Sequence, residues 1–313
     1  MKKPYLISIV TLLIILIGCR QQNDLKRGEG FVNMKGGKVW YRVVGTGNKT
    51  PILMVHGGPG YPSYYLNPLS TLGSKRPVIT FDQLGCGRSD RVSDSTLLTL
   101  NHYIEQIRAV VEHLQVKNFY LYGHSAGSIF ATEYALKYPK GMKGLILNAI
   151  FFNSELYKKD LDVVIARLPD SIQIPLRKNI LNENQEKERL KQAFAYFHSH
   201  VYRTNPKLSA DNDSSRRFAA SPVGGDKIWG SGLLLPTGVL KNYDKTKDVK
   251  KIFIPTLLIG GEYDIVQPNT LHYFQGSIPK SEIVIIKNAG HETMHDNVEG
   301  ELNAIFNFIK NLE

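Results

Sequence analysis

Short apolar runs alternate with amphipathic stretches over most of the chain, a pattern typical of an α/β protein. The run at 51–56 is apolar throughout its centre, which predicts a strand buried on both faces of a sheet. Residues 100–114 place apolar side chains at the spacing of a helix with one buried face. Further strands are predicted at 38–45, 78–82, 119–122, 144–150, 255–260 and 282–286, with a closing helix at 298–312. We therefore expect a mostly parallel central sheet with helices on both faces.

The pattern changes in the middle of the chain. Between about residues 151 and 250, strand-like runs stop and helical or polar stretches replace them. Because the α/β pattern then resumes, this segment is interpreted as a helical insertion that forms a cap or lid over a site. The predicted organisation is a signal peptide at 1–18, a tether at 19–29, a first part of the core at 30–150, the lid at 151–250 and a second part of the core at 251–313.

The first residues have the pattern of a secretory signal. A positively charged start is followed by an apolar run at 6–17, which is too short for a comfortable membrane span. The run ends in Leu-Ile-Gly-Cys, which resembles the bacterial lipobox. This resemblance implies that Cys19 is lipid-modified and that acyl chains hold the protein to a membrane of the bacterial cell envelope. Because Arg20 is not aspartate, the outer membrane is expected if the cell is Gram-negative. A plain signal peptide or an uncleaved anchor is the alternative.

Composition adds few constraints. The 313 residues, of which 42% are hydrophobic, suffice for one large α/β domain or two smaller ones. The net charge of +11 could attract nucleic acid or an anionic membrane, but the basic residues are scattered, and no nucleic-acid partner is expected. The two cysteines are Cys19 and Cys86, so no intrachain disulfide is predicted.

One strand–turn–helix unit carries the candidate chemistry. Residues 122–127 read Tyr-Gly-His-Ser-Ala-Gly, between the predicted strand at 119–122 and a helical stretch at 128–136. In this context Gly-x-Ser-x-Gly is a nucleophile elbow, because small neighbours allow the sharp, strained turn that exposes the serine. Ser125 is therefore the candidate nucleophile. A chance match in an ordinary turn is the alternative.

A serine nucleophile needs a base and a group that orients the base. Asp264 and His291 follow the ends of two later predicted strands, where parallel strands bring side chains to the same edge of the sheet. Ser125, Asp264 and His291 stand in the chain order of an α/β-hydrolase triad. The alternative is that Asp264 is an ordinary turn aspartate and His291 a loop histidine without a catalytic role. Lower-ranked rivals, which do not stand at strand ends, are Glu262, His295 and Asp296.

The oxyanion hole requires two backbone N–H donors. Ala126, the residue after the nucleophile, is one candidate. The other comes from the loop 56–60, His-Gly-Gly-Pro-Gly, where we favour Gly58, with Gly57 close behind. A tight glycine–proline turn without a donor role is the alternative. No metal or organic cofactor is implied.

Together these motifs resemble the proline iminopeptidase family, the prolyl aminopeptidases of the α/β-hydrolase fold. The resemblance runs from about residue 30 to the end of the chain. The stretches that carry it are 56–60, 82–89, the elbow, 196–203, 229–244, 261–264 and 289–294. It implies a serine hydrolase that removes an N-terminal residue, often proline, from peptides.

The sequence departs from the family at the position of the substrate's amino group. Some members bind this group with two glutamates, and the matching positions here are Leu233 and Ile265. Because a buried ammonium without a carboxylate partner costs several kcal/mol, a substrate without a positive charge is expected to be preferred. The acids that could compensate are Glu133, Glu155 and Glu262.

Three functions therefore stay open. The first is a proline iminopeptidase-like enzyme acting on a small peptide. The second is a carboxylesterase, amidase or lactonase acting on a small uncharged ester or amide. The third is a binding lipoprotein that keeps the fold without catalysis. A dehalogenase or an epoxide hydrolase on this fold is disfavoured, because it would need a carboxylate in place of Ser125.

Overall fold

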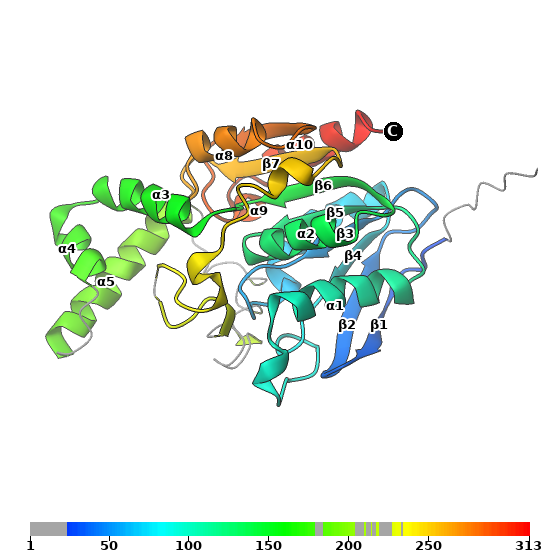
Figure 1. The fold of residues 1–313 in the computed structure, drawn as a ribbon, viewed down its shortest axis with the longest axis horizontal. Coiled ribbons are helices and arrows are strands. Elements are labelled where there is room, and N and C mark those ends of the chain that lie inside the picture. The colour runs from blue at the N-terminus through cyan, green and yellow to red at the C-terminus, as the bar shows by residue number, and fades with distance from the viewer. Residues whose placement is uncertain are drawn as a thin grey trace, which may run out of the picture.

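An eight-stranded, mostly parallel sheet forms the centre of the molecule (Figure 1). The strands are β1 (Gly28–Met34), β2 (Gly37–Val44), β3 (Ile52–Val55), β4 (Val78–Phe81), β5 (Phe119–His124), β6 (Met142–Asn148), β7 (Thr256–Gly261) and β8 (Ser281–Ile286). Their order in the sheet is β1-β2-β4-β3-β5-β6-β7-β8. Strands β1 and β2 run antiparallel to their neighbours, and the remaining pairs are parallel.

The computed structural model describes residues 24–178, 184–203, 227–232 and 234–313, together with Ala210, Ser214, Arg217 and Phe218. The predicted signal peptide with Cys19, and Leu233, lie outside these residues. None of the helices in the described parts is long and apolar enough to cross a membrane.

Alternation along the strands gives the sheet two apolar faces. In β3, Leu53 and Val55 belong to one core cluster, while Ile52 and Met54 belong to the other. Helices α1 (Leu100–His113), α2 (Ala126–Lys137) and α8 (Pro268–Gln275) contribute to the first cluster. The 3-10 segment η1 (Ser63–Ser74) and helix α10 (Val298–Lys310) contribute to the second. Both faces are therefore covered, as predicted for a doubly wound sheet.

Two of the predicted helices begin at side-chain caps. The Thr99 hydroxyl accepts a hydrogen bond from the His102 N–H at the start of α1 (3.2 Å). The Asn297 side chain accepts one from the Gly300 N–H at the start of α10 (3.0 Å). Each cap satisfies an N–H that has no partner within the helix, which fixes where the helix begins.

The middle of the chain is a helical insertion. Helices α3 (Ser154–Ala166), α4 (Asp170–Lys178) and α5 (Asn184–Val201) follow the carboxyl end of β6 and project beyond the sheet (Figure 1). Tyr157 and Leu161 of α3 and Phe197 of α5 belong to the first core cluster. The insertion is thus packed against the core at the edge of the sheet where β6 ends.

The structure differs from the sequence-based expectation at some short elements. Strand β1 begins at Gly28, inside the stretch predicted to be a tether, and pairs along its length with β2. It is an edge strand with mostly exposed or half-buried side chains, so its sequence lacks a strong apolar pattern. Helix α8 and the single turn α9 (Thr293–Asp296) were not predicted either.

Candidate active site

Ser125 lies on a strained turn between β5 and α2. Its backbone has φ 53° and ψ −124°, a conformation that side-chain-bearing residues rarely adopt. The glycines on either side are required by space, because a Cβ at Gly123 would overlap Gly127 and a Cβ at Gly127 would overlap the carbonyl of Val55. The Ser125 N–H donates to the Asn148 carbonyl at the end of β6 (2.9 Å). The turn is therefore held by neighbouring strands and presents the Ser125 hydroxyl outward.

The structure brings the three predicted triad residues together. The Ser125 hydroxyl lies 3.0 Å from Nε2 of His291, and Nδ1 of His291 lies 2.9 Å from Oδ1 of Asp264. Asp264 is fully buried, and its Oδ1 also accepts from the Ile265 N–H (2.6 Å). With Nδ1–H donated to the carboxylate, Nε2 is free to accept the Ser125 proton. This is the geometry that serine nucleophiles require.

The surroundings of His291 favour its charged form. Burial disfavours the imidazolium, but the charge of Asp264 and its hydrogen bond outweigh burial, so the pKa of His291 is raised above its ordinary value. The charges of Glu292 and Asp296 act in the same direction. A proton taken from Ser125 would therefore be held well by His291.

The loop that carries His291 is held from both sides. The His291 N–H donates to the Val201 carbonyl at the end of α5 (3.0 Å), so the lid contacts the triad directly. Its carbonyl accepts from Nε2 of His124, the residue before the nucleophile (2.8 Å). The backbone of His291 thus has a fixed position relative to both the lid and the elbow.

His124 continues this contact to the opposite wall. Because its Nε2 donates to His291, its Nδ1 must accept, and the Tyr65 hydroxyl donates to it (2.9 Å). The Tyr65 hydroxyl in turn accepts from the Gly57 N–H (2.7 Å). Burial lowers the pKa of His124 to about 3, so its imidazole stays neutral and keeps this pattern. One chain of hydrogen bonds therefore joins the loop 56–60 to His291.

The side chain of His56 orients the loop 56–60. The Gln83 N–H donates to Nε2 of His56 (2.9 Å), so Nδ1 carries the proton and donates to the Gly57 carbonyl (2.9 Å). Since the C=O and N–H of a trans peptide point in opposite directions, this bond turns the Gly58 N–H away from His56. Gly58 lines the space in front of Ser125, as its predicted role requires. The Gly57 N–H is already engaged by Tyr65, which favours Gly58 over Gly57 as the oxyanion donor.

The stretch 82–89 supports this arrangement without entering it. The Asp82 carboxylate is buried, accepts from the N–H (2.9 Å) and the hydroxyl (2.6 Å) of Ser63, and pairs with Nε of Arg88 (2.8 Å). The Arg88 guanidinium lies over the ring of Trp40, 3.3 Å from its centroid. Burial raises the pKa of Asp82, but Arg88, with smaller effects of His56 and Ser63, outweighs burial and holds the pKa below its ordinary value. The motif therefore anchors the segment that follows the loop 56–60.

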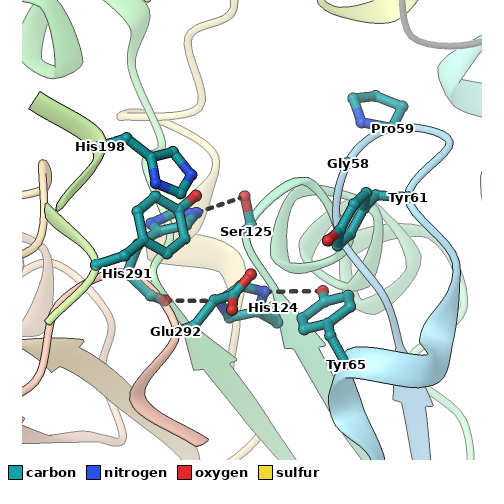
Figure 2. A pocket seen from close by; sticks show the side chains of 10 residues that line it. Gly58, Pro59, Tyr61, Tyr65, His124, Ser125, His198, His291 and Glu292 are labelled. Carbon is teal, nitrogen blue, oxygen red and sulfur yellow. Dashed lines mark hydrogen bonds between the residues drawn. The ribbon is translucent and has the colours of Figure 1, made fainter. Parts of the chain in front are cut away.

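Two cavities meet at Ser125, and Gly58, Tyr202, His198 and His291 border both. The first has a volume of about 400 Å³. Its other lining residues are Pro59, Tyr61, Tyr65, His124 and Glu292, most of which Figure 2 shows around the Ser125 hydroxyl. The second has a volume of about 220 Å³. Its other lining residues are Ala149, Phe151, Tyr157, Phe194, Phe197, Trp229, Leu234, Ile265 and Val266. Beyond the residues that border both, polar and aromatic side chains line the first cavity (the polar cavity), and aromatic and aliphatic side chains line the second (the apolar cavity).

The remaining predicted residues occupy different places. Ala126 is the first residue of α2 and directly follows the nucleophile. Ile265 lines the apolar cavity. Leu233 and Cys19 lie outside the described residues.

The lower-ranked rivals for the triad hold loops. Asp296 accepts from the Gly290 N–H (2.7 Å), Glu262 accepts from the Asn288 N–H (3.0 Å), and Nε2 of His295 contacts the Tyr65 carbonyl (2.8 Å). These contacts tie the loop after β8 to its surroundings. They leave His291 as the imidazole beside Ser125.

The acids proposed to compensate for the missing glutamates do not line either cavity. Glu133 pairs with Lys245 (3.0 Å), and Glu155 stands exposed in the first turn of α3. Among the residues that the structure describes, Glu292 is the carboxylate that lines a cavity at Ser125, and sequence reasoning did not single it out. Its position next to His291 in the chain was the only available signal.

Comparison with known proteins agrees with this geometry. The model of the alpha/beta hydrolase fold family matches residues 50–298. The chain is 30% identical to the proline iminopeptidase of Heyndrickxia coagulans over 91% of its own length and 99% of the relative's. It is also 30% identical to the proline iminopeptidase of Lactobacillus crispatus, over 84% and 91% of the two lengths.

A solved structure shares the whole fold. The crystal structure of a proline iminopeptidase from Mycobacterium smegmatis matches with a TM-score of 0.84 at 23% identity, covering 91% of this chain and 98% of that one. The predicted α/β-hydrolase fold with a helical insertion is thereby confirmed. From the extent of these matches, the chain belongs to the proline iminopeptidase family of α/β-hydrolases.

Proposed function

We propose that the protein is a serine hydrolase that cleaves an amide or ester bond next to an uncharged, apolar acyl group. The observation that carries this proposal is the hydrogen-bonded chain Ser125–His291–Asp264 at the mouth of an apolar cavity. Membership of the proline iminopeptidase family supports the hydrolytic chemistry.

In the first half of the reaction the enzyme is acylated. The Ser125 oxygen attacks the substrate carbonyl carbon while Nε2 of His291 takes the hydroxyl proton. The carbonyl oxygen becomes an oxyanion, which the N–H groups of Gly58 and Ala126 stabilise. The bond to the leaving group then breaks, the leaving group takes the proton from His291, and an ester of Ser125 remains.

In the second half water replaces the leaving group. His291 takes a proton from the water molecule, whose oxygen attacks the acyl carbon of the ester. Cleavage of the Ser125 ester returns the proton from His291 to the serine oxygen and releases the acid. Asp264 remains ionised throughout and holds Nδ1 of His291.

The lining of the second cavity determines the preferred acyl group. Apart from Ser125 and the two histidines His198 and His291, the side chains there are aromatic or aliphatic. By the sequence resemblance, Ile265 matches the position of a glutamate in some family members. An ammonium group placed among these side chains would lose its hydration without gaining a carboxylate partner, which costs several kcal/mol. Esters, amides and lactones with an uncharged acyl group therefore fit better than a substrate with a free N-terminal amine.

Two measurements test the proposal. We expect a fluorophosphonate to label the protein, and we expect the Ser125→Ala variant to remain unlabelled. With a matched pair of anilides, the acetylated proline anilide should be cleaved faster than the free proline anilide. Absence of labelling would leave a binding protein as the function. Faster cleavage of the free amine would favour proline iminopeptidase activity, which the family relation supports as the second candidate.

The same proposal places the enzyme at the bacterial cell envelope through a lipid on Cys19. It rests on the charged start, the apolar run and the Leu-Ile-Gly-Cys ending of the N-terminal segment. Incorporation of a labelled fatty acid in cells should be lost in the Cys19→Ser variant, and the protein should then leave the membrane fraction. A labelled Cys19→Ser variant would contradict this proposal.

A further inference from the structure

The polar cavity at Ser125 has the composition of a site for an organic cation. Three tyrosines, Tyr61, Tyr65 and Tyr202, line it together with the carboxyl side chain of Glu292. Aromatic faces attract ammonium groups, and aromatic residues are the usual walls of sites for quaternary ammonium ligands. The apolar cavity has aromatic walls as well, so the feature that distinguishes the polar cavity is the carboxylate of Glu292, which supplies the opposite charge.

Glu292 is placed to act on a molecule bound at Ser125. The residue is only 8% exposed, and it lines the cavity together with Ser125, as Figure 2 shows. Burial raises the pKa of Tyr65 and of Tyr202, and the charge of Glu292 adds to the effect at both. Glu292 therefore lies near both Tyr65 and Tyr202.

Two of the histidines that line the cavity are neutral when Ser125 reacts. His124 stays neutral because burial lowers its pKa to about 3. His291 must be neutral to accept the Ser125 proton. The ring of His198 stacks on that of Tyr202, with centroids 4.1 Å apart, and extends the aromatic wall.

The chemistry of the triad indicates which part of the substrate reaches Glu292. His291 delivers its proton to the leaving group, so the leaving group lies against the loop that carries His291. Glu292 is the next residue of that loop. The acyl group is then left with the apolar cavity beside Ile265.

We infer that Glu292, with the tyrosines around it, forms a subsite for a positively charged leaving group, such as an alcohol or amine that bears an ammonium. This inference rests on the proposed function, because it assigns the two cavities to the two parts of a cleaved substrate. It makes Glu292 a residue that determines leaving-group specificity.

The test uses two esters of butyric acid that differ in one charge. The choline ester carries a quaternary nitrogen, and the 3,3-dimethylbutyl ester carries a carbon in the same place. At an alkaline pH where the rate no longer depends on pH, we expect the wild-type kcat/KM to be at least ten times higher for the choline ester. In Glu292→Gln this ratio should fall markedly, and the tyrosines account for any preference that remains. The exposed Glu299→Gln loses the same charge on α10 and should keep the wild-type ratio.

A measurement on the wild type alone tests the inference even if the Glu292→Gln variant does not fold. Free choline should inhibit hydrolysis of the neutral ester more strongly than 3,3-dimethylbutanol, its uncharged analogue. Equal inhibition, a wild-type ester ratio near one, or a ratio retained in Glu292→Gln would each overturn the inference. A preference for free proline anilide that depends on Glu292 would also overturn it, because the carboxylate would then serve the acyl side.

Failure of the proposed function would look different. In that case neither ester would be hydrolysed, and the fluorophosphonate would not label Ser125. The inferred subsite would then be wrong as well. If Ser125 is labelled and the neutral ester is hydrolysed without any charge preference, only the subsite is wrong.

Discussion

The charge balance around His291 sets the pH at which Ser125 can react. Nε2 must be unprotonated to accept the serine proton, while Asp264 and its neighbours favour the protonated imidazole. The interactions that stabilise the charged imidazole in the intermediate therefore also raise the pH that is needed to deprotonate Nε2 of His291. His124 does not titrate in this range, since its pKa is about 3.

We predict that kcat/KM rises with pH and levels off above a midpoint higher than 6.5. Below the raised pKa of His291 the imidazole is protonated, so the rate should fall tenfold for each pH unit. The measurement is kcat/KM for an uncharged ester across the pH range in which the fold is stable. A midpoint below 6.5 would contradict the balance described for His291.

A second prediction concerns the hydrogen-bond chain through Tyr65. In Tyr65→Phe the Gly57 N–H and Nδ1 of His124 both lose their partner, and an unsatisfied buried group costs about 1–3 kcal/mol. We expect kcat to fall on the order of ten- to a hundredfold with little change in KM for an uncharged ester. Tyr273→Phe, which removes the same hydroxyl from an exposed ring, should retain wild-type kcat. A rise in KM with unchanged kcat would mean that Tyr65 binds the substrate and does not position the loop.

Sequence reasoning reached the residues of the elbow and the triad because each stands in a local motif. Ser125 lies between two glycines, and Asp264 and His291 follow apolar runs, so position in the chain predicts position at the sheet edge. Glu292 has no such motif. Its entry into the cavity depends on how the loop after β8 turns, which no local pattern specifies.

At the scale of elements, the central strands were predictable and the edges were not. Strands β3, β5, β6 and β7 are buried on both faces, so their sequences are apolar runs. Strand β1 pairs with one neighbour and exposes most of its side chains, so its pattern is weak. The lid was predictable as helical, but its contacts with the triad, which include a backbone hydrogen bond from His291 to Val201 and a ring contact between Tyr202 and His291, depend on how the end of α5 meets the loop after β8.

The contact between lid and triad gives a prediction at this scale. Gly290 packs so closely on the end of α5 that an added Cβ would overlap the Val201 carbonyl, which accepts from the His291 N–H. Gly290→Ala must therefore push the lid from the loop or move His291, and kcat/KM should fall at least a hundredfold. Gly276→Ala is the matched control, since the nearest atom to its added Cβ is 3.6 Å away. Wild-type activity in Gly290→Ala would show that the lid contact does not position His291.

At the scale of the molecule, a buried polar cluster joins elements from both halves of the chain. Glu301 of α10 is fully buried and accepts from the Tyr122 hydroxyl of β5 (2.7 Å), the Asn148 amide of β6 (2.8 Å) and the Thr293 hydroxyl of α9 (2.6 Å). Asn148 also holds the elbow through its carbonyl, and Thr293 lies two residues after His291. The cluster therefore connects the segments that carry Ser125 and His291.

The charge of Glu301 links this cluster to the stability of the whole fold. Burial raises the pKa of its carboxyl group, and the three donors lower it without cancelling the effect of burial, so the pKa in the folded state is raised. A raised carboxyl pKa means that the folded state prefers the protonated form. The associated stability is complete below the unfolded pKa and is lost as the pH rises through the folded pKa.

We therefore predict that the free energy of unfolding of the wild type, measured relative to Glu301→Gln, declines as the pH rises above about 4.5. Glutamine keeps the neutral form at every pH, so the difference isolates the ionisation of Glu301, at about 1.4 kcal/mol for each unit of pKa shift. Denaturant unfolding of both proteins at a series of pH values measures it, and Glu299→Gln should show no such trend. A difference that grows with pH would mean that the three donors outweigh burial, and that the cluster holds a stabilised carboxylate beneath the active site.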